Sequence, residues 1–489
     1  MAQSALPFFR DLNFGLLDAG VEAQRFPDFF HSSFYDFKQA ASRVRQGEVW
    51  SLIGPKGAGK SAVLEWLALE WSENPLRFLS RWEMGDFPVA DVTQIHVGGI
   101  SGPSKVRAAW QFLLLLRVFE SLMSDEGASY DREVIRLKKD LTTAGLIGGP
   151  DLRTRFGEWT TSTVSYKVGG LGGSSTYEEH DATPLQLVEL LRAALRRVDT
   201  KSRHVIAIDG LDSFFEQTSE ALDSLGAMVD CVAALNLWLE QENVPASVVF
   251  AIRADMFGRI PSTDSAKMAA HAVRLDWSNK GAGESNQLWN LLNSKAISSV
   301  SVDHSGRKIK DLRQDYLMTP IRVRRWESIP DYFTEHTRLL PRDMVALMIA
   351  LQEQHAGPGP VHESSAKAAV RQYAEGYFLD EIGNGLSRVL PNASSQLVPE
   401  FLAALSTLDS PFFKAVDLEA ELAGAISNGD LRLLLKQMFE IGGIGMRVGR
   451  GPKYHTNFVF RRGAGGGFSF LGTFRLHHAL EEAWNIIPG

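Results

Sequence analysis

The stretch from Gly54 to Ser61 reads Gly-Pro-Lys-Gly-Ala-Gly-Lys-Ser, and it constrains the fold of this chain more than any other segment. Its glycines allow a tight turn whose backbone N–H groups point at a phosphate, and its Lys-Ser ending adds a cation and a hydroxyl ligand for magnesium. A short apolar run precedes it at residues 48–53, and apolar residues at helical spacing follow at residues 62–69. A strand, a glycine turn and a helix N-terminus together form an anion site. The sequence therefore predicts that the chain binds ATP with Mg²⁺.

Composition excludes several other classes of protein. The 489 residues have room for several domains of roughly 100–200 residues, and 44% hydrophobic content predicts a sizeable core. A net charge of −7 gives no overall reason to expect nucleic-acid or membrane binding. The single cysteine, Cys231, excludes an intramolecular disulfide framework and lies in an apolar stretch, where we expect inert core. There is no secretory signal pattern, and the most apolar segment, residues 110–119, is too short to span a bilayer, so we expect a cytoplasmic protein.

Strand-like and helical segments alternate through the first part of the chain. Buried strands are predicted at residues 203–212, where the run ends in acids, at 246–253 and at 272–277, with a second strand at 92–97. This alternation predicts an α/β fold of the P-loop type, with a parallel sheet covered by helices on both faces. From about residue 285 the sequence is mainly helical, and its last part has the outline of a winged helix, with helices followed by a short β-hairpin.

These patterns predict four regions. Two glycine-rich pieces flank polar sequence in the middle of the nucleotide domain, where we expect an insertion with mobile loops. The insertion lacks a Lys-Ser ending, which favours a flexible connector over a second phosphate loop. The regions are an aromatic-rich lead-in (1–47), a P-loop ATPase domain (48–284) with the insertion at about 124–183, a helical lid (285–395) and a winged-helix-like domain (396–489).

Two acids follow the buried strand that starts at residue 203. Asp209 comes at the carboxyl end of the strand, where a carboxylate can hold magnesium through water. We expect it to meet the phosphate loop at the tips of adjacent strands. The usual hydrolytic version of this site has a glutamate general base at the next position. This chain has Gly210 there, so we expect hydrolysis to be slow. Asp212 is the candidate for activating the attacking water, and its alternative role is an N-cap of the following helix.

Three cations are further candidates, each with a structural alternative. Arg253, at the end of a buried strand, can sense the γ-phosphate or pair with Asp255. Lys56 can add charge beside the phosphates or remain solvated. Arg342 can let a helical lid contact the nucleotide, or it can be a surface residue that caps the following helix. The predicted nucleotide-binding residues are Gly54, Pro55, Lys56, Gly57, Ala58, Gly59, Lys60, Ser61, Ala62 and Arg342, with Ser61 and Asp209 at the metal and Asp212 and Arg253 in catalysis.

The C-terminal segment, residues 441–489, is basic in an otherwise acidic chain. With aromatic residues on a wing-like hairpin, such a segment can lie along the backbone of duplex DNA, and the alternative is a solvated or protein-binding face. The adjacent pair His477-His478 lacks cysteine or acidic partners at ligand spacing, so we expect no metal site there. The basic residues are Arg447, Arg450, Lys453, Arg461, Arg462 and Arg475, against Glu481 and Glu482.

Several motifs together resemble a bacterial family of P-loop ATPases allied to the STAND and KAP groups of the AAA+-like division. The resemblance implies an additional-strand α/β ATPase domain, a helical lid, a C-terminal winged helix and links to phage defence, DNA processing or conformational signalling. Leu340 departs from the family, which tends to have arginine before the proline. The motifs are Phe14-Gly15, Asp18-Ala19, Glu22 and Phe34-Tyr35 before Gly54–Ala62, then Asp209–Asp212, Arg253–Phe257, Leu275–Trp277, Leu340–Asp343 and His477–Leu480.

Two hypotheses follow from the motifs and the resemblance. In the first, ATP binding switches the conformation or assembly of a homo-oligomer that controls an effector protein such as a nuclease, with no membrane partner. In the second, the chain is an ATP-dependent DNA-binding protein in DNA processing or repair. A metabolic kinase is disfavoured, because the long C-terminal part offers no recognisable site for a small substrate.

Overall fold

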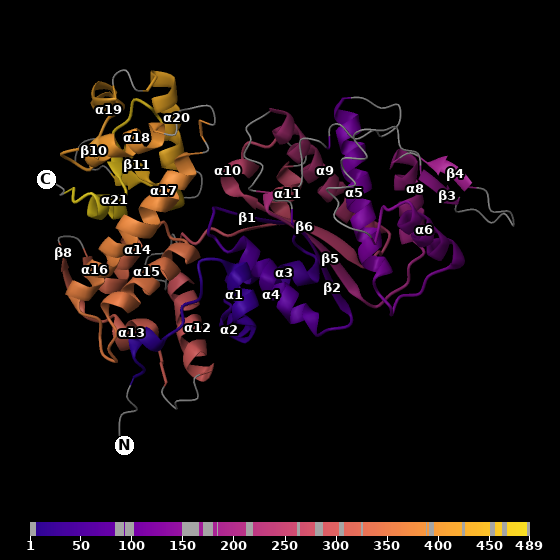
Figure 1. The fold of residues 1–489 in the computed structure, drawn as a ribbon, viewed down its shortest axis with the longest axis horizontal. Coiled ribbons are helices and arrows are strands. Elements are labelled where there is room, and N and C mark those ends of the chain that lie inside the picture. Colours follow the sequence, from indigo (N-terminus) through magenta and orange to yellow (C-terminus); the bar gives the residue numbers. More distant parts are fainter. Residues whose placement is uncertain are drawn as a thin grey trace. The chain divides into compact units, whose positions relative to one another are not determined.

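Figure 1 shows the computed structural model, in which the chain forms two compact units. The sheet unit comprises residues 36–56 and 60–275, and the C-terminal unit comprises residues 1–35, 57–59 and 276–489. The structure describes residues 6–83, 92, 102–148, 166–169, 179–182, 184–211, 219–261, 265–278, 287–302, 308–323, 326–387, 389–390, 396–422, 426–449, 455–461 and 467–486.

A five-stranded sheet forms the centre of the sheet unit, in the order β2-β5-β6-β1-β7, with every pairing parallel. Its inner strands are continuous apolar runs, buried almost throughout, as expected where helices cover both faces. The predicted parallel α/β fold is therefore confirmed. The strands are β1 (Ser51–Gly54), β2 (Arg77–Glu83), β5 (Arg203–Asp209), β6 (Ala246–Arg253) and β7 (Ala272–Arg274).

The strand order corrects one expectation. Asp209 and the phosphate loop do not end adjacent strands, because β6 lies between β5 and β1. Gly54, the last residue of β1, is the register partner of Arg253, and Ile208 of β5 pairs with Phe250 of β6. A parallel crossover can pass over a neighbouring position, so sequence order alone does not give strand order. The extra strand is the arrangement that the resemblance implies.

Strand β2, which lies at one edge of the described part of the sheet, was not predicted. At its carboxyl end Arg81 and Glu83 are exposed on either side of buried Trp82, and the four residues before them are half-buried. Such a pattern is typical of an edge strand that is covered on one face and exposed to solvent on the other. The strand predicted at 92–97 falls, except for Val92, outside the described residues.

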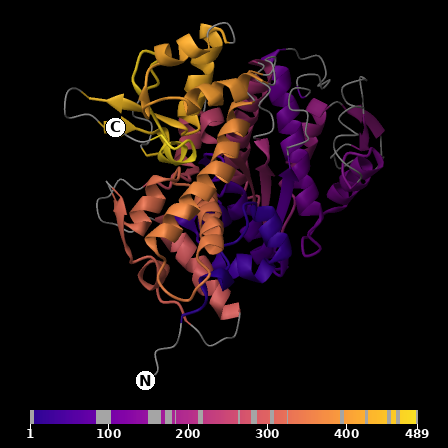
Figure 2. The same ribbon diagram turned by 60° about the vertical axis from the view of Figure 1, so that its left-hand side comes forward.

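Helices cover both faces of the sheet (Figures 1 and 2). Helices α3 and α4 lie on one face, and α5 and α9 lie on the other, where they share a large apolar core with the sheet. Among the described helices α9 alone is long and apolar enough to cross a membrane, but 67% of its apolar window is buried in this core. The helices are α3 (Ala40–Gln46), α4 (Lys60–Ser72), α5 (Pro103–Met123), α6 (Arg132–Thr143), α8 (Pro184–Leu195), α9 (Ser219–Gln241), α10 (Ala254–Phe257) and α11 (Ser265–Ala270).

The predicted insertion contains regular structure where the chain is described. Helix α6 begins at Asp131, whose side chain accepts a hydrogen bond from the Val134 N–H, and it buries three apolar residues at helical spacing. An antiparallel hairpin follows, made of β3 (Tyr166–Gly169) and β4 (Glu179–Ala182). The sequence analysis predicted an insertion with mobile loops and named none of these elements, because the glycine-rich pieces drew attention away from the amphipathic helix.

A buried histidine makes the stability of the sheet unit depend on pH. His204 is fully buried, stacks on Phe78 with ring centroids 4.6 Å apart, and lies 3.6 Å from the Asp125 carboxylate. Burial lowers the pKa of His204 to about 4, although Asp125 acts in the opposite direction. The unfolded chain has a histidine pKa of about 6.5, so stability is fully present above that pH and is lost as the pH falls toward 4.

We therefore expect the free energy of unfolding to fall between pH 7 and pH 4.5, with about 2 kcal/mol of the loss due to His204. Guanidinium denaturation at both pH values measures this, with the His204→Gln variant as the comparison. The variant should be less stable at pH 7 but should lose less on acidification. Equal losses in the two proteins would contradict the role given to His204.

The C-terminal unit includes the first part of the aromatic-rich lead-in, residues 1–35, whose described residues are packed. Phe9 is fully buried against Tyr316, whose hydroxyl donates to the Pro7 carbonyl oxygen at 2.7 Å. Helix α2 packs on α12, and Glu22 forms a buried ion pair with Lys295 at 2.5 Å. The helices are α1 (Ala19–Arg25), α2 (Pro27–Ser33), α12 (Gln287–Val302), α13 (Leu312–Tyr316), α14 (Ile329–Glu335), α15 (Pro341–Gln354), α16 (Glu363–Tyr373) and α17 (Leu379–Leu386), with a π-helical turn at Ala374–Phe378 and a hairpin of β8 (Pro320–Val323) and β9 (Trp326–Ser328).

The last part of this unit is winged-helix-like, as expected. Three helices, α18 (Leu397–Ser406), α19 (Ala415–Glu421) and α20 (Asn428–Glu440), accompany an antiparallel sheet in the order β10-β13-β11-β12, and α21 (His478–Ala483) follows. The strand-like sequence at 444–448 forms β11 (Ile444–Val448), whereas the strand-like sequences at 457–461 and 468–470 lie mainly outside the strands. The other strands are β10 (Phe412–Phe413), β12 (His455–Asn457) and β13 (Phe474–Leu476).

Candidate nucleotide-binding site

The phosphate loop connects β1 to α4, as the sequence predicts. The strand ends at Gly54 and the helix begins at Lys60. Gly57 and Gly59 have φ values of +84° and +95°, in the left-handed region that only glycine adopts without strain. An added Cβ at Gly59 would meet no heavy atom within 4 Å, so the space beside this glycine is open. The loop therefore has the shape of an anion cradle.

The Lys60 side chain folds back onto the start of this loop. Lys60 is only 7% exposed, and its ammonium donates to the carbonyl oxygens of Gly54 at 3.1 Å and Pro55 at 3.2 Å. These neutral oxygens are weaker acceptors than phosphate oxygens, so the ammonium gains stronger, charge-assisted bonds when phosphate is offered. Ser61, by contrast, is exposed in the first turn of α4, where its hydroxyl can be a magnesium ligand.

The tip of the loop, Gly57–Gly59, belongs with the C-terminal unit, which supplies two anchors for it. The Trp277 Nε1 donates to the Ala58 carbonyl oxygen at 2.9 Å. The backbone N–H of Arg342 donates to the Gly57 carbonyl oxygen at 3.4 Å, and its guanidinium Nε donates to the Leu17 carbonyl oxygen at 2.9 Å. The sequence analysis found Arg342 but gave Trp277 no role in the loop.

Asp209 and Arg253 reach the same face of the sheet as α4. The alternate residues Ile208 and Ile252 lie in the apolar core that β5 and β6 share with α5, so the residues after them point to the other face. Asp209 is 8% exposed, and its Oδ1 accepts from the Gly210 N–H at 2.8 Å. The carboxyl end of the sheet therefore presents this carboxylate on the side where α4 begins.

Arg253 forms the ion pair that the sequence analysis gave as its alternative role. Its Nε and Nη2 donate to the two carboxylate oxygens of Asp255 at 3.0 and 2.6 Å. Both side chains are mostly buried, at 13% and 19% exposed. Arg253 lies at the end of the strand between the phosphate loop and Asp209. For a sensing role its guanidinium would have to bind a phosphate in addition to Asp255.

The remaining candidates are placed as follows. Lys56 is exposed in the loop, and Pro55 beside it is exposed as well. Ala62 lies in the first turn of α4 and is half-buried. Asp212 lies outside the described residues, so its role as base or N-cap stays a prediction. The residues that are described fit a triphosphate with its metal: an open glycine cradle, a buried ammonium, an exposed hydroxyl and a strand-end carboxylate.

Sequence reasoning missed two charged residues at this edge, Arg81 and Glu83 on β2. Glu83 is the register partner of Asp209. Arg81 donates to Glu65 of α4 at 2.5 Å and also contacts Glu83. The signal that could have found them is the charged-apolar-charged run Arg81-Trp82-Glu83, because such alternation predicts a half-buried strand.

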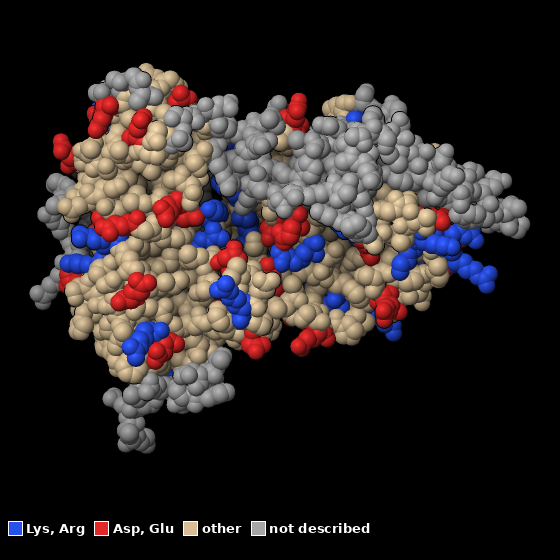
Figure 3. All heavy atoms as spheres, in the orientation of Figure 1, with Lys and Arg blue, Asp and Glu red and all other residues tan. Residues whose placement is uncertain are grey.

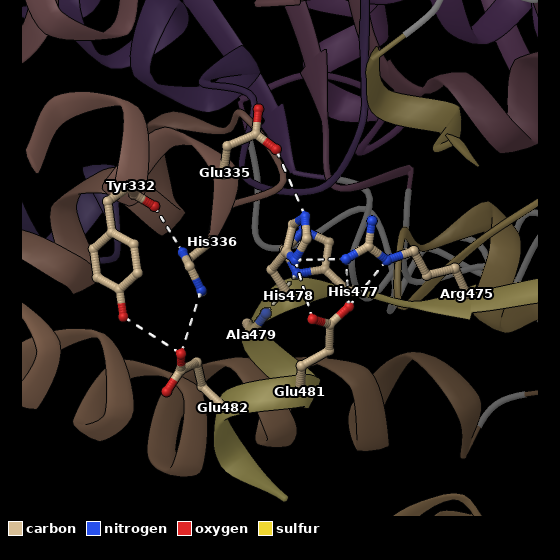
Figure 4. A network of polar contacts seen from close by, with 9 residues as sticks. All are labelled: Tyr332, Glu335, His336, Arg475, His477, His478, Ala479, Glu481 and Glu482. Carbon is tan, nitrogen blue, oxygen red and sulfur yellow. Dashed lines mark hydrogen bonds and ion pairs between the residues drawn. The ribbon is translucent and has the colours of Figure 1, made fainter. Parts of the chain in front are cut away.

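The pair His477-His478 belongs to a polar network within the C-terminal unit (Figure 4). His478 lies 3.3 Å from Glu481 on α21 and 3.7 Å from Glu335 on α14, and His336 lies 3.9 Å from Glu482. Burial lowers the pKa of His478, and Glu481 opposes this. In the described part of the chain no group of three or more His, Cys, Asp or Glu is arranged to hold a metal ion. The network therefore joins α14 to α21.

The basic C-terminal segment is only partly a surface feature. Arg475 is 6% exposed and donates to Glu481 at 2.9 Å, so its charge is compensated inside the unit. Arg447 is exposed on β11, whereas Arg450, Lys453 and Arg462 lie outside the described residues. On the face in Figure 3, acidic and basic side chains of the C-terminal unit are interspersed, with no wide field of one sign among the described residues.

Comparisons with known proteins give matches in structure alone. No protein-family model matches the sequence, and no curated protein matches it. Among the solved structures that match are Cdc6p from Pyrobaculum aerophilum, at 8% identity and a TM-score of 0.28 over 92% of this chain and 94% of that one, and the ORC2 protein from Aeropyrum pernix, at 10% identity and a TM-score of 0.33 over 92% and 91%. Because both TM-scores are low, the functional argument rests on the residues of this chain.

Proposed function

We propose that this chain binds ATP with Mg²⁺ at the phosphate loop, hydrolyses it slowly and acts as a nucleotide-dependent conformational switch. The observation that carries the proposal is the buried Lys60 ammonium, held by the Gly54 and Pro55 carbonyl oxygens in a loop with two left-handed glycines. A buried cation gains most from an anion, and a triphosphate supplies one.

The other residues would have distinct roles. Ser61 and Asp209 would hold the magnesium ion, which neutralises negative charge on the phosphates. The backbone N–H groups of the loop would orient the phosphate oxygens. Gly210 supplies no carboxylate where the usual hydrolytic version has one, and this supports slow turnover.

The proposal has a finer form, which rests on the family resemblance. In that form the chain assembles as a homo-oligomer when ATP binds and controls an effector protein, such as a nuclease, in phage defence. Trp277 and Arg342 support coupling between nucleotide and assembly, because both hold the tip of the phosphate loop from the C-terminal unit. Movement of the loop tip would therefore reach the helical part of that unit.

A second function, ATP-dependent binding of duplex DNA, is supported by one observation. The C-terminal unit carries a winged-helix-like fold, and Arg447 is exposed on the strand that leads into the basic stretch. The buried Arg475–Glu481 pair takes one cation out of that surface, so we place this function second.

One experiment separates the two functions. Sedimentation velocity of the full chain with ATP, with ADP and without nucleotide should show larger assemblies only with ATP, and without any DNA. Duplex binding is measured in parallel at 50 and 200 mM salt, where a phosphate-reading surface loses affinity steeply. Assembly that requires DNA, or tight binding that falls sharply with salt, would favour the second function. A chain with no affinity for ATP would refute both.

A further inference from the structure

The proposed ATPase site lacks a described carboxylate where a water-activating base is expected. Asp209 accepts a hydrogen bond from the Gly210 N–H and is assigned to the metal. Gly210, with φ +76°, has no side chain to offer. Among the described residues, a base would therefore come from another element that reaches the carboxyl edge of the sheet on the side of α4.

Strand β2 brings a glutamate to this position. Glu83 pairs in register with Asp209 on the neighbouring parallel strand, and register partners on such strands lie about 5 Å apart. Trp82 belongs to the apolar core on the α5 side, so the side chains of Arg81 and Glu83 point to the opposite face, the face of α4. Glu83 thus shares both its edge and its face of the sheet with Asp209.

Arg81 ties Glu83 to the helix that carries the phosphate-binding residues. Its guanidinium donates to Glu65 at 2.5 Å and forms a second ion pair with Glu83. Glu65 lies four residues after Ser61, so the two are on one side of α4. The Glu65–Arg81–Glu83 chain therefore fixes Glu83 relative to the predicted magnesium ligand Ser61.

The Glu83 carboxylate is open to solvent. Its side chain is 58% exposed, so water can reach it beside Arg81.

We propose that Glu83 is the general base of ATP hydrolysis in this chain, with Arg81 as its positioning residue. A Glu83 carboxylate oxygen accepts a proton from water as the water oxygen bonds to the γ-phosphorus. The bond between that phosphorus and the β–γ bridging oxygen breaks, ADP leaves, and the proton passes from Glu83 to solvent. This assignment rests on the proposed function and replaces Asp212 as the base.

The test compares four forms of the full chain: wild type, Glu83→Gln, Asp212→Asn and Glu48→Gln. Glu48 is the matched control. It is an exposed glutamate paired with Arg43, and it lies just before β1, at the amino-terminal ends of the strands. Affinity is measured by titration with a fluorescent ATP analogue and Mg²⁺, and turnover by phosphate release in single-turnover conditions from pH 5 to pH 9.

For Glu83→Gln we expect ATP affinity within about 2-fold of wild type and a turnover rate lower by about 10²- to 10³-fold. The rise of the rate at the acidic end of the pH profile should disappear with it, a change that a merely structural role would not produce. Glu48→Gln should match wild type in both measurements.

Three outcomes overturn the assignment. Turnover of Glu83→Gln within about 3-fold of wild type would do so, as would a loss confined to Asp212→Asn, which would return the base role to that residue. A wild-type chain that binds ATP and releases no phosphate would also overturn it, while leaving the binding switch in place. A wild-type chain that binds no ATP refutes the proposed function itself.

Discussion

Replacing Lys60 with alanine is expected to weaken ATP binding by about 10²-fold or more. Lys60 is the buried cation of the loop, and its loss leaves the phosphates without their charge-assisted partner. Truncating one partner of a buried, hydrogen-bonded charge pair costs about 2–5 kcal/mol of binding free energy. Titration with a fluorescent ATP analogue in the presence of Mg²⁺ measures the change.

The same loop offers a matched control. Lys56 is exposed, four positions earlier, and its replacement with alanine should weaken binding much less than that of Lys60, because water screens an exposed charge. Lys60→Met preserves most of the buried volume and should bind as weakly as Lys60→Ala, which separates loss of charge from collapse of the loop. Retained affinity in both Lys60 variants would contradict the assigned site.

Replacing Asp343 with alanine is expected to destabilise the C-terminal unit by about 3–5 kcal/mol. Asp343 is fully buried at the start of α15 and accepts hydrogen bonds from the Arg338 guanidinium at 2.9 and 2.7 Å and from the Tyr377 hydroxyl at 3.2 Å. Arg338 is itself buried and lies over the Phe378 ring. Removing the carboxylate takes the closest anion from a guanidinium inside the unit and leaves it the more distant Glu381, 4.0 Å away.

Differential scanning calorimetry measures this effect. For a unit of this size the midpoint temperature of unfolding shifts by about 2–4 °C per kcal/mol, so it should fall by about 10 °C. Lys367→Ala, which removes an exposed pair with Glu363, is the control and should leave the transition nearly unchanged. Arg338→Met combined with Asp343→Leu should recover most of the loss, because apolar residues can replace a buried pair. An unchanged transition in Asp343→Ala would contradict this account.

The centre of the sheet unit could be predicted from sequence because the physics there is local. Strands β5 and β6 are buried on both faces, so each appears as an uninterrupted apolar run, and the phosphate loop has a fixed spacing. The order of the strands could not be predicted, because it depends on how each crossover packs. As a result Asp209 was expected one strand closer to the loop than it lies.

The edges of the molecule were harder to predict, for two physical reasons. Strand β2 has water on one side, so its Arg81 and Glu83 obscured the pattern and the proposed base went unnoticed. In the C-terminal unit, Phe458 and Phe460 both lie within 5.5 Å of the His477 ring, centroid to centroid, instead of alternating across a strand. An aromatic run that packs around one side chain has the composition of a strand without its geometry.

The pairing of β1 has a consequence for how the chain is made. In the described part of the sheet its neighbours are β6 and β7, and Ala246, the first residue of β6, comes about 190 positions after Gly54. At about 5–20 residues per second, a ribosome needs roughly 10–40 s to supply that partner. Until then the glycine turn emerges on an unpaired segment with an exposed edge, open to chaperones or to misassembly. Competence to hold nucleotide is therefore acquired late in translation, and a nascent chain stopped before β6 should lack it.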